Sequence, residues 1–383
     1  MSRMQLFLFM TDGMSLTRWR DLGMLDRELA LYVRLASRVD GVFIVSYGGR
    51  EDADIVSTLP GIEVICNRWG LPQRVYKHLL PILLKGSIRG PAIFKSNQVK
   101  GADLAFKLAR RLKVGFVARC GYLLSEFQEY EFGQGSKEHN EAVGLEQLVF
   151  TGSDCCVVTT ETMRARLLEY GVKEERLKVV PNYVDTDLFS PSGNGLVNAK
   201  RAVFIGRLEA QKNPIVLIQA LEGLGVRLDV VGDGSLRHQL KAEASRRDVE
   251  VIFHGNIPHT ELPRIVRESA LFILPSHYEG HPKTLLEAMA CGTAVIGARV
   301  PGIQEVISHQ STGWLCEPTA AGLREAINTL LENPELRTAM GDAAREFIIS
   351  EYDLSRIVEM ELAVYSKVWS DAENLGEGQS CPE

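Results

Sequence analysis

Residues 270–292 read ALFILPSHYEGHPKTLLEAMACG, which combines an apolar run, a polar loop and a short helical pattern. The run ALFILP (270–275) has the length of a buried strand, and TLLEAMA (284–290) has the spacing of a helix. Glu279 falls in the loop and Glu287 in the helix. Ligands of open α/β sheets bind beyond the carboxyl ends of strands, so we expect both carboxylates to border one crevice. A surface acid is an equally simple interpretation of Glu287.

Apolar segments of strand length recur on both sides of the chain's midpoint, with helical patterns between them. The first series is QLFLFM (5–10), GVFIVSY (41–47), IEVIC (62–66), PAIFKS (91–96), VGFVAR (114–119), CCVVTT (155–160) and LKVVP (177–181). The second is AVFIGR (202–207), RLDVVGDG (227–234), VEVIFHG (249–255), ALFILP, TAVIGA (293–298) and TGWLCEP (312–318). This alternation predicts two α/β domains, each with a parallel sheet and helices on both faces.

A polar segment separates the two series. Residues 182–200, NYVDTDLFSPSGNGLVNAK, are rich in Asn, Asp, Ser, Gly and Pro, which is typical of a linker. It divides an N-terminal domain (1–181) from a C-terminal domain (201–350). We expect a terminal helix over 351–372, with packing against the N-terminal domain as one option, and a disordered tail over 373–383.

The composition limits the class of protein. At about 150 residues per domain, 383 residues suggest two or three domains. The net charge of -6 argues against a nucleic-acid partner. Seven scattered cysteines without a C-x-x-C pair favour free thiols in a reducing, cytoplasmic compartment over disulfides or a zinc site. Because no run of about 18 apolar residues occurs, we predict no membrane span.

One segment is strongly basic although the whole chain is acidic. Residues 71–120 contain eleven basic residues and a single acid, Asp103. Within them, RVYKHLLPILLKGSIR (74–89) interleaves basic and apolar residues. Such a segment is suited to peripheral contact with the inner face of an anionic membrane. A solvated helix face over core leucines, or a site for an anionic acceptor, explains the pattern equally well.

Two loops of the second half carry groups suited to a diphosphate. GRLEAQKN (206–213) follows a strand, and its Arg207 and Lys212 offer a planar fork and a point charge. VGDGS (231–235) opens a helix after a strand, so its backbone N–H groups could face an anion. Taken alone, each has a simpler interpretation: a solvated basic loop and an ordinary tight turn.

Together these stretches resemble the GT-B glycosyltransferases, specifically the retaining family 4 (glycosyl transferases group 1). The matching segments, in order, are PNYVDTDLF (181–189), GRLEAQKN, VGDGSL (231–236), the E-x7-E pair Glu279 and Glu287, and GIQEVI (302–307) with TGWL (312–315). Residues 1–180 match mainly by architecture. The resemblance implies two Rossmann-like domains facing across a cleft, an acceptor-binding domain first and a nucleotide-sugar-binding domain second.

The resemblance also implies roles for single positions. Arg207 and Lys212 would neutralise the donor diphosphate, Glu279 would contact the hydroxyls of the donor sugar, and Glu287 would hold the ribose hydroxyls. Further substrate contacts are implied near the nucleotide base, the donor sugar and the diphosphate. The positions are Gly23, Gly206, Gly232, Gly234, His254, Ile257, Gly280 and His281.

The acceptor side departs from the family pattern. Where the family often has a histidine, this chain has Arg119-Cys120-Gly121-Tyr122, and the family's Gly-Gly turn is Leu22-Gly23 here. Arg119 is the candidate catalytic group on that side, and a buried structural arginine is the alternative.

The predicted function is transfer of a hexosyl group from a UDP-, GDP- or ADP-linked donor to a cell-surface glycan or lipid-linked saccharide. We expect no metal and no cofactor, and the D-x-D spelling Asp185-Thr186-Asp187 lies inside the linker match and reads as a turn. Two alternatives stay open: a nucleotide-sugar 2-epimerase of the same architecture, and a non-catalytic nucleotide-sugar-binding subunit.

Overall fold

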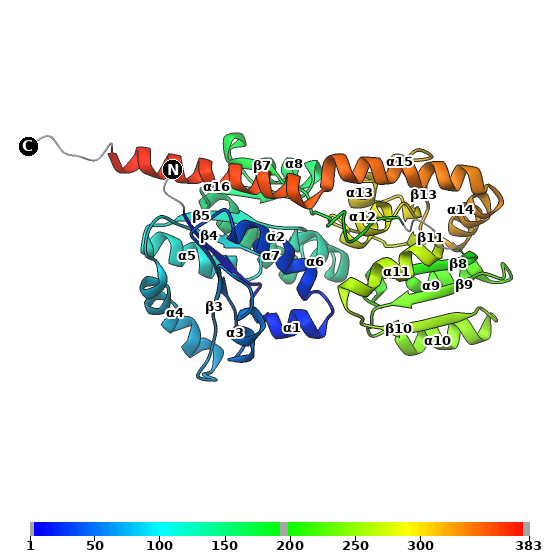
Figure 1. The fold of residues 1–383 in the computed structure, drawn as a ribbon, viewed down its shortest axis with the longest axis horizontal. Helices are drawn as coiled ribbons and strands as arrows, with labels where there is room; N and C mark the ends of the chain where they lie inside the picture. The colour runs from blue at the N-terminus through cyan, green and yellow to red at the C-terminus, as the bar shows by residue number, and fades with distance from the viewer. Residues whose placement is uncertain (1–3, 192–197, 378–383) are drawn as a thin grey trace, which may run out of the picture. The chain divides into compact units, whose positions relative to one another are not determined.

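The computed structural model describes residues 4–191 and 198–377, which form two compact units (Figure 1). Unit 1 comprises Met1–Pro181 and Ile357–Glu383, and unit 2 comprises Asn182–Arg356. The chain therefore passes from unit 1 to unit 2 and returns to unit 1 for its last helix.

Unit 1 is built on a seven-stranded sheet in which every neighbouring pair is parallel, in the order β3-β2-β1-β4-β5-β6-β7. Its strands are β1 (Gln5–Phe9), β2 (Gly41–Val45), β3 (Ile62–Ile65), β4 (Ala92–Ser96), β5 (Gly115–Arg119), β6 (Cys155–Val158) and β7 (Leu177–Val179). Its helices are α1 (Leu16–Asp21), α2 (Leu25–Ala36), α3 (Glu51–Val56), α4 (Gln73–Ser87), α5 (Ala102–Leu112), α6 (Leu124–Phe132), α7 (Lys137–Gly152), α8 (Glu161–Glu169), the 3-10 turn η1 (Glu174–Arg176) and most of α16 (Leu354–Glu377).

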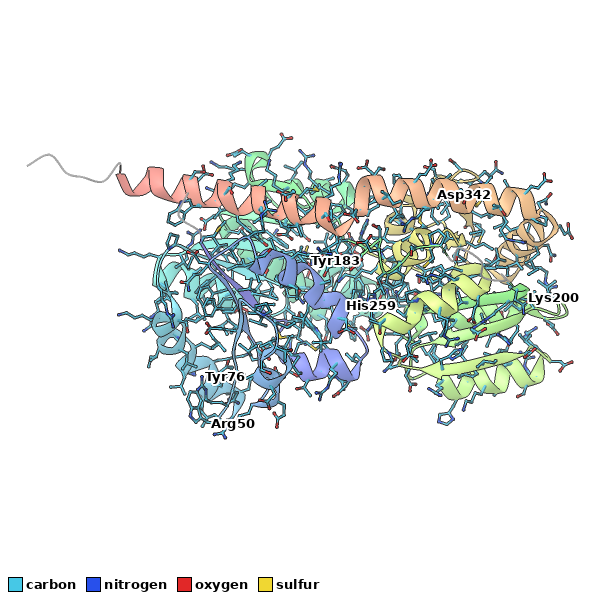
Figure 2. All side chains as sticks on the ribbon, viewed as in Figure 1. Arg50, Tyr76, Tyr183, Lys200, His259 and Asp342 are labelled. Carbon is cyan, nitrogen blue, oxygen red and sulfur yellow. The ribbon has the colours of Figure 1, made fainter. Side chains whose placement is uncertain are left out.

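The core of unit 1 explains why its strands read as continuous apolar runs. All five residues of β1, β2 and β4 are buried, as in a parallel sheet covered on both faces. In register across these strands, the ring of Phe7 stacks on Phe43 at 4.6 Å and meets Phe94 at 5.3 Å. Tyr76 of α4 (Figure 2) is fully buried, and its hydroxyl donates to the Ile65 carbonyl at 2.9 Å.

A buried charge cluster fastens α16 to this sheet. Lys95 of β4 has no exposed surface, and its Nζ donates to Glu361 Oε1 at 2.6 Å and to the Tyr365 hydroxyl at 3.0 Å. The Tyr365 hydroxyl in turn donates to Glu361 Oε2 at 2.6 Å. Burial opposes ionisation of Glu361, but the cations of Lys95 and Arg119 outweigh it and hold the pKa of its carboxyl below the ordinary value.

Unit 2 repeats the arrangement with a six-stranded parallel sheet in the order β10-β9-β8-β11-β12-β13. Its strands are β8 (Asn198–Ile205), β9 (Arg227–Val231), β10 (Val251–Gly255), β11 (Ser269–Leu274), β12 (Ala294–Ala298) and β13 (Trp314–Cys316). Its helical segments are η2 (Ala210–Lys212), α9 (Pro214–Leu221), α10 (Arg237–Arg246), η3 (His259–Glu261), α11 (Leu262–Glu268), α12 (Lys283–Ala290), α13 (Pro301–Gln304), α14 (Ala320–Glu332) and α15 (Pro334–Tyr352).

The two sheets confirm the predicted α/β class with two Rossmann-like units. Each expected strand is present. The runs in the interior of the sheets are buried, as expected for strands covered on both faces, whereas the edge strands β3, β7 and β10 are only partly buried. The predicted linker differs, since its residues 182–191 belong to unit 2: Val184 and Phe189 are buried in the core of that unit, and β8 already begins at Asn198. Residues 192–197 of that prediction lie outside the described residues.

The C-terminal end also differs from the prediction. Helix α16 continues through Glu377, so residues 373–377 of the predicted tail are helical, while 378–383 lie outside the described residues. The segment DAENLGE (371–377) contains Ala, Leu and Glu, which are good helix formers and allow the continuation.

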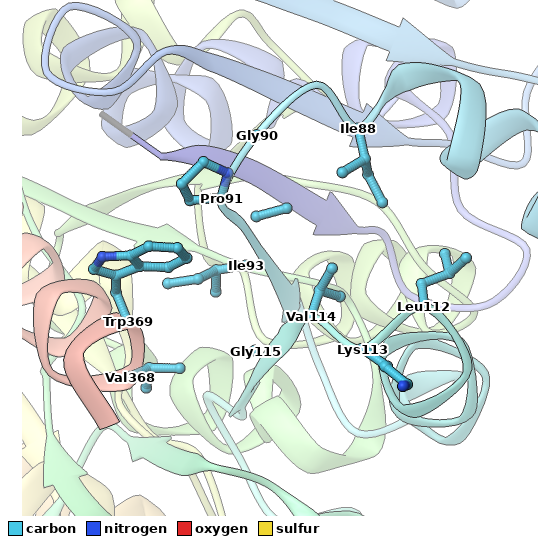
Figure 3. A pocket seen from close by; sticks show the side chains of 11 residues that line it. Ile88, Gly90, Pro91, Ile93, Leu112, Lys113, Val114, Gly115, Val368 and Trp369 are labelled. Carbon is cyan, nitrogen blue, oxygen red and sulfur yellow. The ribbon is translucent and has the colours of Figure 1, made fainter. Parts of the chain in front are cut away.

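A pocket of about 350 Å³ opens at the amino ends of β4 and β5 (Figure 3). Its walls are mainly apolar, and α16 contributes Val368 and Trp369 to them. It lies at the opposite end of these strands from the loops where ligands of open α/β sheets bind, so we assign it no part in the candidate site.

Candidate active site

The candidate site lies where the strand order of unit 2 reverses. β8 is the first strand of its sheet, β9 and β10 extend the sheet on one side, and β11 pairs with β8 on the other. The loops that leave the carboxyl ends of β8 and β11 carry Arg207 and Lys212 on one side and Glu279 on the other. This reversal is the position where open α/β sheets bind ligands.

Lys212 and Glu279 meet directly, although 67 positions separate them in the sequence. Lys212 Nζ lies 2.5 Å from Glu279 Oε1, and the Ser276 hydroxyl donates to the same oxygen at 2.7 Å. The two charged side chains are only 14% and 7% exposed. The site thus already contains a poorly solvated ion pair between one predicted cation and one predicted acid.

Arg207 is tied to the same loop through a residue that the sequence did not single out. Its Nη2 donates to Gln211 Oε1 at 3.0 Å, and Gln211 Nε2 donates to the Tyr278 carbonyl at 2.9 Å. The Gln211 carbonyl accepts from the His277 N–H at 2.9 Å. Gln211 is buried, so it fixes the guanidinium relative to the loop that carries Glu279.

Glu287 lies on α12 and is buried with a histidine partner. Its Oε1 is 2.8 Å from His259 Nε2, and the His259 ring (Figure 2) packs against Phe189 at 4.9 Å. The surface interpretation of Glu287 is therefore wrong. No periodicity in the sequence marks His259 as its partner.

The glycine-rich loop after β9 makes a close approach to the loop after β8. A Cβ at Gly232, whose φ is +121°, would lie 2.1 Å from the Gly206 carbonyl oxygen. The Gly206 N–H donates to the Val231 carbonyl, and the Gly232 N–H to the Gly255 carbonyl. Only glycine fits this contact between the carboxyl ends of three neighbouring strands.

Two of the N–H groups that we expected to face a bound anion, those of Gly234 and Ser235, already face carboxylates of the chain. Glu209 accepts from the Ser235 N–H at 2.9 Å and from its hydroxyl at 2.6 Å, and the Gly234 N–H donates to Asp233. The hydrogen bonds from Ser235 hold the pKa of the Glu209 carboxyl below its usual range. Gly234 lies against this group, because a Cβ there would meet Glu209 Oε1 at 2.8 Å.

The backbone at Gly280 and His281 is held by two other segments. A Cβ at Gly302 would lie 2.1 Å from the Gly280 carbonyl oxygen, so the start of α13 packs directly on the Glu279 loop. The His281 carbonyl accepts from the Asn182 side-chain amide at 2.7 Å, and its buried ring packs on Tyr352 at 5.3 Å.

His254 and Ile257, the two positions predicted near the nucleotide base, have different surroundings. Ile257 packs against the hydrophobic core of unit 2. His254 points its Nε2 at Asp229 Oδ1, 2.6 Å away, and Arg201 binds the same carboxylate at 2.6 Å and 3.1 Å. Burial opposes ionisation of Asp229, yet the hydrogen bonds from Arg201 and His254 outweigh it and lower its pKa. The His254 side chain is thus part of a charge cluster on the sheet.

The two predicted positions of unit 1 lie on separate elements. Gly23 joins α1 to α2, and its N–H donates to the Arg20 carbonyl. Arg119 ends β5 with 8% of its surface exposed, and its Nη1 lies 3.5 Å from the Asn97 carbonyl. Charge interactions with Glu361 and Glu28 surround this guanidinium, as in the structural alternative for Arg119.

Residues 4–191 and 198–377 contain neither a metal-binding cluster nor a membrane-spanning helix. No group of three or more His, Cys, Asp or Glu side chains there is placed to hold a metal ion. None of the helices in this part of the chain is both long and apolar enough to cross a membrane.

Two family models match adjoining parts of the chain. The model described as Glycosyltransferase Family 4 matches residues 30–188, and the model described as Glycosyl transferases group 1 matches residues 190–347. Together with the two parallel-sheet units, these matches define a GT-B architecture. The chain belongs to the GT-B glycosyltransferases of the family 4 type.

Known proteins and structures agree with this assignment at low identity. A glycogen synthase from Mycobacterium tuberculosis is 27% identical over 231 residues, which cover 58% of this chain and 56% of that protein. The chain thus spans little more than half the length of this curated relative. The structure of a sucrose-phosphate synthase from Thermosynechococcus elongatus matches with a TM-score of 0.78 at 19% identity, over 96% of this chain and 100% of the other. Anabaena HepE, solved in complex with UDP and glucose, matches with a TM-score of 0.76 at 19% identity, over 95% and 100%.

Proposed function

We propose that the protein is a retaining glycosyltransferase that moves a sugar from a nucleotide-sugar donor to a cell-surface glycan or lipid-linked saccharide. One observation supports this most directly. The cations Arg207 and Lys212 and the acid Glu279 come from two loops at the point where the strand order of unit 2 reverses, inside the region matched by the group 1 model.

The chemistry follows from charge. Breaking the bond between the anomeric carbon and the diphosphate leaves negative charge on the diphosphate and positive charge on the carbon. Arg207 and Lys212 stabilise the departing diphosphate, and their fixed positions mean that little reorganisation is needed during the reaction. Glu279 accepts hydrogen bonds from the sugar hydroxyls and Glu287 from the ribose. On the acceptor side, Arg119 stays the proposed group.

A ligand screen followed by a turnover assay tests this proposal. UDP, GDP, ADP and their sugars are added separately, and a ligand at about 100 times its dissociation constant should stabilise the protein by ~2.7 kcal/mol. UDP is the first choice, because a protein of similar fold was solved with it. Release of nucleoside diphosphate only when an acceptor is present supports transfer. Inversion of the sugar without an acceptor indicates an epimerase, and binding without turnover indicates a binding subunit.

We further propose that transfer needs no divalent metal. The two cations supply the charge that a metal would otherwise bring to the diphosphate. Initial rates are compared after dialysis against EDTA and after addition of Mg²⁺ or Mn²⁺. Equal rates support the proposal, and loss of activity that Mn²⁺ restores refutes it.

Peripheral contact with the cytoplasmic face of an anionic membrane is proposed for part of the segment 71–120. Two of its cations are internal, because Lys95 and Arg119 are buried. The face of α4 retains exposed Val75 (46%) and Ile82 (70%) beside exposed basic residues such as Lys85, so apolar and cationic groups share one surface.

Flotation with vesicles tests this contact. The protein should float with vesicles that contain anionic lipid and much less with neutral vesicles, and Ile82→Glu should reduce the bound fraction. Equal binding to both vesicles, or an unchanged Ile82→Glu variant, contradicts the proposal.

A further inference from the structure

We propose that Glu279 makes unit 2 discriminate against free nucleoside diphosphate, in addition to any contact with the donor sugar. This inference rests on the proposed function. It concerns the product rather than the donor, and it follows from the ion pair with Lys212.

Two hydrogen-bond donors hold the Glu279 carboxylate in place. Its Oε1 receives two donors, Lys212 Nζ at 2.5 Å and the Ser276 hydroxyl at 2.7 Å, and Ser276 has no exposed surface. The Glu279 side chain is 7% exposed. The carboxylate is therefore held beside the cation that a diphosphate needs, in surroundings where water screens charge weakly.

The nucleotide sugar and the free nucleoside diphosphate differ in the charge of the terminal phosphate that approaches the Lys212–Glu279 pair. In a nucleotide sugar, the terminal phosphate is esterified to the sugar and carries one negative charge. In the free nucleoside diphosphate, the same phosphate carries close to two, since its last pKa is near neutrality. A phosphate that binds Lys212 must lie near the carboxylate paired with it, so repulsion by Glu279 is stronger for the free diphosphate.

The hydroxyls of the sugar add to the difference. A nucleotide sugar can donate hydroxyl hydrogen bonds to Glu279 and so compensate the carboxylate for a weakened contact with Lys212. A free diphosphate has no such donors and leaves a poorly solvated carboxylate beside an anion. Glu279 thus favours binding of the donor over retention of the product.

The test is a binding titration of the full chain. The dissociation constants of UDP, GDP and ADP are measured calorimetrically for the wild type, for Glu279→Gln and for Glu279→Ala. For the nucleotide that binds the wild type, both variants should bind the free diphosphate roughly tenfold more tightly. Affinity for the nucleotide sugar should rise less or fall.

Two matched variants separate this effect from others. Ser276→Ala removes a hydrogen bond but keeps the carboxylate, so it should not tighten binding of the diphosphate. Glu335→Gln removes an exposed acid on α15 and reports the effect of net charge alone. Thermal unfolding of each variant verifies that it is folded.

The outcomes separate a failure of the discrimination by Glu279 from a failure of the proposed function. If the wild type and the Glu279 variants bind none of the three diphosphates and none of their sugars, the proposed function fails. If a nucleotide sugar binds the wild type, and the folded Glu279 variants bind its diphosphate no more tightly than the wild type does, the discrimination by Glu279 is refuted while the proposed function stands.

Discussion

Replacement of Glu361 should show how much its ion pair with Lys95 stabilises the packing of α16 on the sheet of unit 1. The substitution Glu361→Gln keeps the shape of the side chain and removes its charge. Lys95 would then have a buried ammonium group whose charged partner is lost, with the Tyr365 hydroxyl at 3.0 Å and the Tyr32 and Tyr365 rings within 5.6 Å.

The magnitude follows from burial. Lys95 is 0% exposed and Glu361 1%, so solvent cannot compensate the remaining charge. Loss of one partner of a buried ion pair typically costs about 3–5 kcal/mol. For a unit of this size each kcal/mol lowers the melting temperature by about 2–4 °C, so the transition of unit 1 should fall by roughly 6–20 °C.

The assay is thermal unfolding combined with hydrogen exchange of α16 peptides, because two units can melt in separate transitions. Glu359→Gln on the same helix is the matched control. It breaks the exposed pair with Arg38, whose side chains are 49% and 62% exposed, and it should change little. The triple variant Lys95→Met, Glu361→Leu, Tyr365→Phe replaces all three polar groups and should recover most of the loss.

The pH dependence gives a second readout. The folded-state pKa of Glu361 lies below its ordinary value of 4.5, so the carboxyl stabilises the fold fully above that pH and loses its contribution as the pH falls through the folded-state value. Glu361→Gln should lack this part of the acid destabilisation. If Glu361→Gln is no less stable than Glu359→Gln, the reasoning from burial is refuted.

Three further predictions use matched pairs of variants. Gly232→Ala should lower the free energy of unfolding by roughly 1–3 kcal/mol more than Gly225→Ala. Both glycines have positive φ, but only a Cβ at position 232 would meet a backbone oxygen. Equal denaturant midpoints for the two variants would contradict this. Gln211→Leu should lower the rate of diphosphate release about tenfold at saturating donor. Gln211→Glu should lower this rate less, because it keeps an acceptor for Arg207. If both variants release diphosphate at the wild-type rate, Gln211 does not position Arg207. Arg345→Met should destabilise unit 2 by about 2 kcal/mol or more, because the carbonyls of Thr186, Phe189 and Ala290 lose a donor. Arg324→Met removes only one hydrogen bond, to the Glu222 carbonyl at the surface, and should have a small effect in the same melt.

The sequence predicts the elements of this fold better than their contacts. The strands can be recognised in the sequence because burial on both faces requires unbroken apolar runs, as in QLFLFM and ALFILP. Residues 182–191 are misleading, because their polar composition suggests a linker, whereas five of them are buried: Asn182, Tyr183, Val184, Thr186 and Phe189. Composition averages over a segment, whereas packing depends on single side chains.

In the candidate site, too, the sequence predicts the elements better than the contacts between side chains. Motif order places Arg207, Lys212 and Glu279 on two loops, but only the fold shows that Lys212 and Glu279 form an ion pair. Gln211 stands inside a quoted motif, yet its hydrogen bond to the Tyr278 carbonyl depends on a loop 67 positions away. His259 and Ser276 carry no spacing signal, since their partners are set by the packing of α12 and by the turn after β11.

The return of the chain to unit 1 has a consequence for biosynthesis. Lys95 leaves the ribosome 266 residues before Glu361, and all of unit 2 is made in between. At ~5–20 residues per second this interval lasts roughly 13–50 s. During that time unit 2 can complete its core, while the sheet of unit 1 contains the Lys95 ammonium group before its partner Glu361 has been made. A chain truncated after Arg356 and released from the ribosome should therefore combine a protease-sensitive first unit with a folded second unit.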